Sequence, residues 1–157
     1  MGLDMYLLKK KRGEKELDWN NELAYWRKAN QIHKWFVDNI QEGTDDCGYY
    51  KVERKDVERL LAICEEVLEK SVLKKGKIVN GWTFKNGVRE AILEDGKYIE
   101  NQEIAERLLP TSQGFFFGSP EYDEYYIKDL EHTVERCKDI LDTFNFEEEE
   151  LYYTSSW

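Results

Sequence analysis

The sequence has little of what builds metal sites, disulfides or cofactor cradles. It has two histidines and three cysteines (Cys47, Cys64 and Cys137), and no CxxC or HExxH pair occurs. Zinc sites usually show such paired spacings, so we expect no bound metal. The Walker loop, GxGxxG and the GxSxG nucleophile elbow are also absent, so no cofactor and no catalytic residue is expected.

Long apolar runs are missing as well. No segment approaches the roughly 20 consecutive apolar residues of a membrane-spanning helix. The apolar run at the N-terminus is only a few residues long, which does not fit a signal peptide. An odd number of scattered cysteines is typical of a reduced compartment. These absences predict a cytoplasmic protein that does not contact a membrane.

Acidic residues outnumber basic ones by 33 to 23, so the net charge is −10. The acids concentrate in residues 119–157, where twelve of them stand against three cations. A nonspecific binder of duplex nucleic acid needs a basic face, so we exclude that partner. An acidic region can instead occupy a basic groove on another protein, as a mimic of nucleic acid would.

Hydrophobic periodicity indicates the first elements. Alternation over residues 3–8 predicts a strand. Asn20 and Asn21 are good caps, and a helix is predicted from there to about Gln41. On this helix a core stripe and a polar shoulder beside it are expected: Tyr25, Ala29, Ile32, Phe36 and Ile40 on the stripe, and Trp26, Asn30, His33 and Val37 on the shoulder. Arg27 then points to solvent.

The later elements follow from turn signals and apolar stripes. Asn-Gly at 86–87, with Asn-Gly at 80–81 and Asp-Gly at 95–96, predicts a projecting β-hairpin. The other expected elements are a strand near 49–53, a helix with Cys64 on its apolar face, a short helix over 102–109, an aromatic strand at 114–118, a long helix with Ser119 as N-cap and Pro120 at its first position, and a last strand after Glu150.

This order of elements does not alternate evenly between strands and helices. We therefore predict an α+β fold, with a mainly antiparallel sheet packed by two or three helices. The length of 157 residues fits a single domain over residues 1–157, with residues 77–100 inserted as the β-hairpin.

Aromatic and polar residues together indicate a binding site. Aromatic faces with a few cations and amides can hold an anionic or nucleotide-like ligand. The candidate residues are Trp26, Arg27, Lys28, Asn30 and His33 from the first helix, with Phe116 and Tyr122 from the aromatic segment. The alternative is that these rings fill the core. A homodimer would cover Arg27 and use the exposed tyrosines and tryptophans.

Two other functions stay open at this point. The acidic region 119–157, with the run Glu147–Glu150, could inhibit a host or defence protein. A small enzyme could use Cys47 as nucleophile and His33 as base. Asp45 and Asp46 precede Cys47, and nearby acids raise a thiol pKa, which disfavours the enzyme.

Several blocks resemble a family of small proteins encoded in bacteriophages and prophages. These blocks are spread along nearly the whole chain, from residue 2 to residue 157: GLDMYL, YWRKANQIHKWFV, DDCGYY, KNGVREAILEDGK, LLPTSQGFFFGSPEYDEYY and YYTSSW. The resemblance implies a phage protein of the host-cell cytoplasm, and it brings no catalytic residue with it. Small accessory phage proteins often bind host or defence factors or sequester nucleotide signals, so the resemblance favours binding over catalysis.

Overall fold

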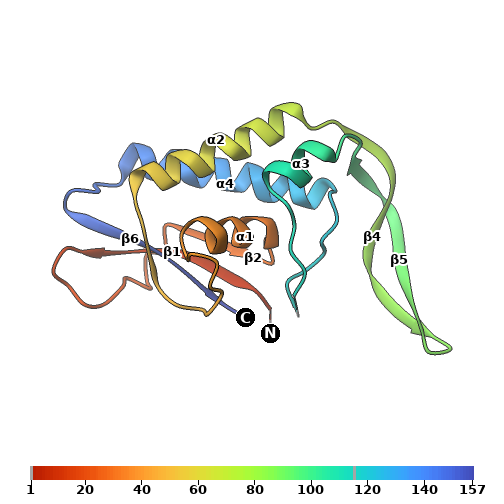
Figure 1. Cartoon of the computed structure of the whole chain (residues 1–157), viewed down its shortest axis with the longest axis horizontal. Coiled ribbons are helices and arrows are strands. Elements are labelled where there is room, and N and C mark those ends of the chain that lie inside the picture. The colour runs from red at the N-terminus through yellow and green to blue at the C-terminus, as the bar shows by residue number, and fades with distance from the viewer. Residues whose placement is uncertain (1, 115) are drawn as a thin grey trace.

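The computed structural model describes residues 2–114 and 116–157, and the chain has an α+β fold (Figure 1). Its elements, in chain order, are β1 (Asp4–Lys11), β2 (Ala24–Arg27), α1 (Asn30–Asn39), β3 (Tyr50–Val52), α2 (Arg54–Lys70), β4 (Leu73–Lys85), β5 (Val88–Ile99), α3 (Glu103–Leu108), α4 (Glu124–Thr143) and β6 (Glu149–Ser156). None of the helices in the described ranges has both the length and the apolar character needed to cross a membrane.

The main sheet has the order β2-β1-β6-β3, with antiparallel neighbours. One of its faces carries Met5, Leu7 and Tyr153, which are almost fully buried. Phe36 of α1 stacks on the Tyr153 ring with the two centroids 3.9 Å apart. Trp26 of β2 reaches α4. Helices α1 and α4 therefore pack on this face and close the core.

Helix α2 packs outside α4 (Figure 1). It begins with a capping box, in which the Glu53 and Asp56 side chains accept from each other's backbone N–H groups. Cys64 and Cys137 are buried between the two helices, and the predicted core position of Cys64 is confirmed. Burial raises the pKa of the Cys137 thiol to about 12 and that of Cys64 also well above its usual value, so both remain protonated.

The predicted hairpin is confirmed and is longer than expected. Strands β4 and β5 pair from Leu73↔Ile99 to Lys85↔Val88, and the turn is Asn86-Gly87, where both residues have positive φ. The other two signals do not mark turns. Asn80-Gly81 lies where the register shifts between Val79 and Trp82, and Asp95-Gly96 lies inside β5.

The helix predicted from Asn20 to Gln41 is wrong in its first half. Residues 24–27 are strand β2, which pairs with β1 in the register Met5↔Trp26, and α1 begins only at Asn30. Lys28 has a φ of 58°, in the left-handed region, which separates the strand from the helix. Residues 24–27 therefore alternate between the two sides of a sheet and do not form a helical stripe.

Two predictions in the aromatic segment are also wrong. Gly114 and residues 116–118 form no strand, and position 115 lies outside the described residues. Phe117 N–H bonds to the Gly114 carbonyl, and Phe116 has a φ of 66°, which bends the chain. Ser119 does not cap α4. The cap is Asp123, whose carboxylate accepts from the N–H groups of Tyr125 and Tyr126.

Candidate functional site

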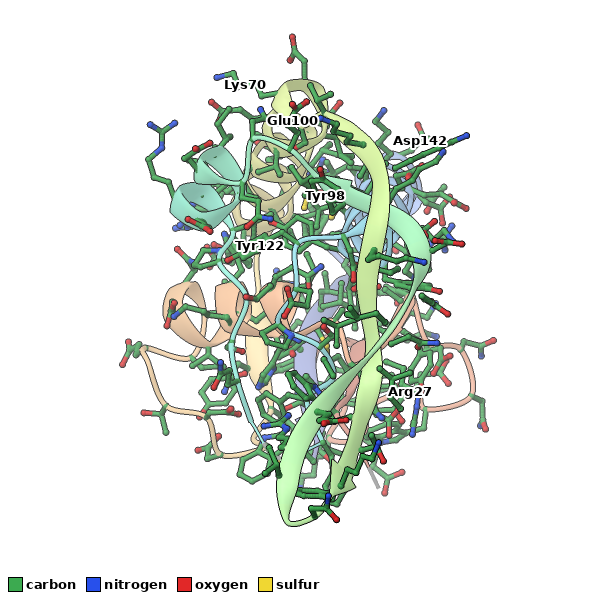
Figure 2. The ribbon with its side chains drawn as sticks, turned by 90° about the vertical axis from the view of Figure 1, so that its right-hand side faces the viewer. Arg27, Lys70, Tyr98, Glu100, Tyr122 and Asp142 are labelled. Atoms are coloured by element: carbon green, nitrogen blue, oxygen red, sulfur yellow. The ribbon has the colours of Figure 1, made fainter. Side chains whose placement is uncertain are left out.

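A cleft of about 670 Å³ separates the β4–β5 hairpin from the body of the protein. We call it the hairpin cleft. Figure 2 shows the hairpin passing in front of the body, with Arg27 beside its lower half. Basic, aromatic and acidic side chains line it, among them Arg27, Lys28, Trp82, Arg89, Tyr125 and Asp129. It contains three of the cations of a strongly acidic chain, so its chemistry differs from that of the rest of the surface.

The turn after β2 brings two of these cations to the cleft. Arg27 ends the strand and pairs with Asp4 at 3.0 Å, with about half of its side chain exposed. Lys28 donates its backbone N–H to the Leu3 carbonyl at 2.7 Å, and its stem packs on Gly118, where an added Cβ would lie 2.9 Å from Lys28 Cβ. Lys28 forms no ion pair with any described residue, so its ammonium group is available to a ligand.

The hairpin supplies the opposite wall. The Arg89 guanidinium lies over the Trp82 ring, 4.0 Å from its centroid, and has no carboxylate partner in the described ranges. Trp82 is 46% exposed. A guanidinium on an indole face is held by cation–π attraction and keeps its N–H donors free. The sequence reasoning did not select Trp82 or Arg89.

The third wall is the start of α4, and it is acidic. Asp123 uses its carboxylate as the helix cap, and Glu121 lies just before it. Burial raises the pKa of Asp129 to about 6, and the hydrogen bond from Gln31 Nε2 (3.2 Å) lowers it only in part. Below pH 6 the cleft therefore loses one of its negative charges. The sequence reasoning did not select Asp129 either.

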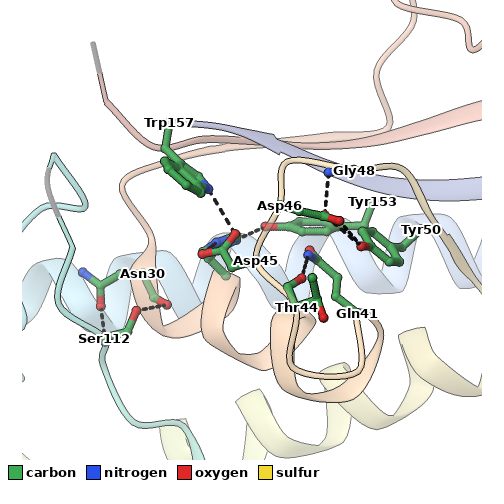
Figure 3. Close-up of polar contacts among 11 residues, drawn as sticks. Asn30, Gln41, Thr44, Asp45, Asp46, Gly48, Tyr50, Ser112, Tyr153 and Trp157 are labelled. Carbon is green, nitrogen blue, oxygen red and sulfur yellow. Dashed lines mark hydrogen bonds and ion pairs between the residues drawn. The ribbon is translucent and has the colours of Figure 1, made fainter.

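Two of the residues assigned to the polar shoulder lie in the core instead. Trp26 is 3% exposed, and its indole N–H donates to Thr133 Oγ1 at 2.9 Å. The Asn30 amide donates to the carbonyls of Phe117 and Ser119, and its oxygen accepts from Ser112 N–H (Figure 3). Neither side chain faces the hairpin cleft. The Trp26 hydrogen bond joins β2 to α4, and the Asn30 hydrogen bonds join α1 to the segment 112–119.

Phe116 and Tyr122, the other aromatic candidates, do not line the hairpin cleft. The Tyr122 hydroxyl accepts from Thr111 N–H at 3.1 Å, and its ring lies 5.2 Å from that of Tyr126. Phe116 is 44% exposed, and its carbonyl accepts from Leu3 N–H. Of the seven candidates, only Arg27 and Lys28 reach the cleft.

His33 is buried in a hydrogen-bonded chain. Its Nε2 lies 3.0 Å from a carboxylate oxygen of Asp45, and its Nδ1 lies 2.6 Å from the Tyr153 hydroxyl (Figure 3). Trp157 donates its indole N–H to the other oxygen of Asp45. Both nitrogens of His33 are occupied, and no hydrogen bond joins it to Cys47 within the described chain. The pairing that a Cys–His nucleophile needs is therefore not formed.

The sheet neutralises two of the four acids in the run at 147–150. Because β6 pairs with β1, Glu149 lies beside Lys9, and Glu150 contacts both Lys10 and Lys51, at 3.8 and 3.1 Å. An inhibitor that mimics nucleic acid would need this charge unpaired. Among the described residues Glu147 and Glu148 form no ion pair, so in this run the acidic-inhibitor hypothesis rests on these two side chains.

A Trp26→Phe variant is expected to lose about 2 kcal/mol of unfolding free energy, because it removes a buried hydrogen bond and part of a core ring. Urea denaturation followed by circular dichroism measures this. The matched control is Trp82→Phe on the exposed hairpin, which should stay within about 0.5 kcal/mol. If Trp26 faced a ligand site instead, the two variants would be equally stable.

Comparisons with family models, with curated proteins and with solved structures found no match. Within the described residues, no three His, Cys, Asp or Glu side chains gather where they could hold a metal ion. The geometry of the hairpin cleft is therefore the main guide to function.

Proposed function

We propose that this chain is a non-enzymatic accessory protein of a bacteriophage that binds an anionic, nucleotide-like ligand in the hairpin cleft. One observation carries the proposal: Arg27, Lys28 and Arg89 come from two separate segments and converge on one cleft of a chain with a net charge of −10. Like charges repel one another, so such a cluster is stabilised when an anion binds between its members.

The mixed lining suits a nucleotide better than a simple polyanion. The phosphates would meet Lys28 and Arg89, while the base would lie against the exposed rings of Trp82 and Tyr125. Stacking of a base on an aromatic ring contributes about 1–3 kcal/mol. Glu121 can accept hydrogen bonds from the amino groups of a base, and inorganic phosphate has no such groups.

The phage context rests on the sequence resemblance, and free thiols suit the host cytoplasm as the place of action. In that setting, sequestering a nucleotide signal would serve counter-defence or host modulation. A protein that only sequesters its ligand needs no catalytic group, which agrees with the occupied ring of His33.

The test is a thermal-shift assay with nucleoside mono-, di- and triphosphates and cyclic dinucleotides. A ligand at a hundred times its Kd adds about 2.7 kcal/mol, which raises the melting temperature of a domain of this size by about 5–10 °C. The double variant Lys28→Gln/Arg89→Gln should lose this shift, because its neutral amides cannot offset the phosphate charge.

The matched control is Lys51→Gln, a charge removed from β3 outside the hairpin cleft, which should keep the full shift. A panel in which no nucleotide moves the melting temperature of the unmodified protein would exclude the proposed function. So would a shift that Lys28→Gln/Arg89→Gln retains.

A further inference from the structure

A pocket of about 450 Å³ lies on the side of the main sheet that faces away from α1 and α4. Tyr152 of β6 pairs with Leu8, and its neighbour Tyr153 is in the core, so the alternation of the strand places Tyr152 on the outer side. Trp19, from the loop between β1 and β2, and Tyr49, just before β3, line the pocket with it. We call this site the aromatic pocket. It shares no lining residue with the hairpin cleft.

The rings of the aromatic pocket are held in place by the protein itself. The Trp19 ring packs edge-on against Tyr6, with the two centroids 5.2 Å apart. The Lys10 ammonium lies 5.3 Å from the centroid of the Tyr152 ring and is fixed by Glu150 at 3.8 Å. A site whose rings are already positioned loses little conformational entropy when it binds a ligand. The pocket is therefore prepared for binding in the free protein.

The angle between Trp19 and Tyr49 determines which shape of ligand fits. The two rings are nearly perpendicular, at 82°, with centroids 6.5 Å apart, and they are 49% and 58% exposed. They form a corner and not a flat platform. A planar base can stack on only one wall of such a corner, whereas a puckered pyrrolidine ring can contact both walls. The geometry thus favours proline rings over nucleobases.

The polar groups around these rings are mainly hydrogen-bond donors. The indole N–H of Trp19 and the hydroxyls of Tyr49 and Tyr152 bond to no described residue, and Glu16 is the one carboxylate that lines the pocket. A polyproline II segment is the complement, because its backbone carbonyls are free and its prolines have no N–H. Proline-rich segments dock on aromatic grooves in this way. An ordinary extended peptide would instead bring many N–H groups that need acceptors.

The charges around the pocket select an acidic ligand of low charge. Lys10 and Lys51 are both engaged by Glu150, at 3.8 and 3.1 Å. Lys15 lines the pocket and forms no ion pair within the described ranges. One available cation suits a single carboxylate beside the prolines, whereas a nucleic acid brings a row of phosphates that needs several cations.

We propose that the aromatic pocket binds a proline-rich segment of a partner protein in the polyproline II conformation, with an acidic residue beside the prolines. The proline rings lie in the corner of Trp19 and Tyr49, the free donors bind the peptide carbonyls, and Lys15 pairs with the acid. This interaction does not depend on the proposed nucleotide, because the two sites have separate linings. Each can fail without the other.

The test is fluorescence anisotropy with a labelled oligoproline peptide that ends in two glutamates. Tyr49→Ala removes one wall of the corner and should weaken binding at least about tenfold. Trp19→Phe keeps a ring but loses the indole N–H, and it should weaken binding about two- to tenfold. Lys15→Gln should weaken binding of this peptide but not of an oligoproline peptide without glutamates. The matched control is Phe84→Ala, a more exposed ring outside the pocket, which should bind normally.

Circular dichroism verifies the fold of each variant. An unmodified protein that does not bind the oligoproline peptide at about 1 mM overturns the proposal. So does undiminished binding by Tyr49→Ala, or equal binding of a glycine–serine peptide with the same two glutamates. A single-stranded oligothymidylate that binds in place of the oligoproline peptide, and is lost in Tyr49→Ala, would assign the pocket to nucleic acid and also overturns it.

Discussion

A His33→Ala variant is expected to lose about 3–5 kcal/mol of unfolding free energy. The carboxylate of Asp45 can only accept, which places the hydrogen of His33 on Nε2 and leaves Nδ1 to accept from the Tyr153 hydroxyl. Alanine would leave a cavity next to Phe117 and Tyr153 and would leave that hydroxyl without a hydrogen-bond partner inside the core. Cavity formation costs about 2–5 kcal/mol, and a buried hydroxyl without a hydrogen-bond partner costs about 1–3 kcal/mol.

Urea denaturation followed by circular dichroism measures this loss, and Cys47→Ser is the informative companion variant. Cys47 is partly exposed in a loop, so its replacement should change stability by less than about 1 kcal/mol. A double-mutant cycle with Tyr153→Phe should show coupling to His33, because both lose the same hydrogen bond. A fully stable His33→Ala protein would contradict the structural role and reopen the pairing of His33 with Cys47.

The fold class is readable from the sequence because its signals are local. The Asn86-Gly87 turn, the apolar stripe of α2 and the alternation in β1 each lie within one stretch of chain. Strand β2 has no such signal. Residues 24–27 fit a helical and a strand period equally well, and only their pairing with β1 selects the strand. Assigning residues 24–27 to a helix then placed Trp26 on the polar shoulder, whereas the strand places it in the core.

The site was harder to predict because its walls are far apart in sequence. Arg27 and Lys28 belong to the stretch that the aromatic pattern singled out. Trp82 and Arg89 face them only because the hairpin folds back across the cleft, which no local pattern records. A weak signal existed: the turn at Asn86-Gly87 brings positions 82 and 89 close together, and this places an arginine beside a tryptophan.

An Asp129→Asn variant is expected to be more stable than the unmodified protein at neutral pH. The pKa of Asp129 is raised by burial from 3.8 to about 6 in the folded state. Between these values the folded chain binds a proton that the unfolded chain does not, so stability falls as pH rises from about 4 to about 6. The rise in the pKa of Asp129 corresponds to about 3 kcal/mol of unfolding free energy. Asparagine should recover this amount above pH 6, while its oxygen still accepts from Gln31.

Thermal unfolding across this pH range tests the prediction. The way in which the stability gain changes with pH is more informative than the size of the gain. The gain of Asp129→Asn should be small at pH 4, where the carboxyl is protonated in the folded state and about half ionised in the unfolded state, and should vanish below about pH 3. Asp142→Asn, an exposed acid on the same helix, should show no such pH-dependent gain. If both variants behave alike, Asp129 is not desolvated. If only Asp129→Asn gains with rising pH, the buried carboxylate destabilises the folded protein at neutral pH, and protonating it below pH 6 should also tighten the binding of a phosphate beside Lys28.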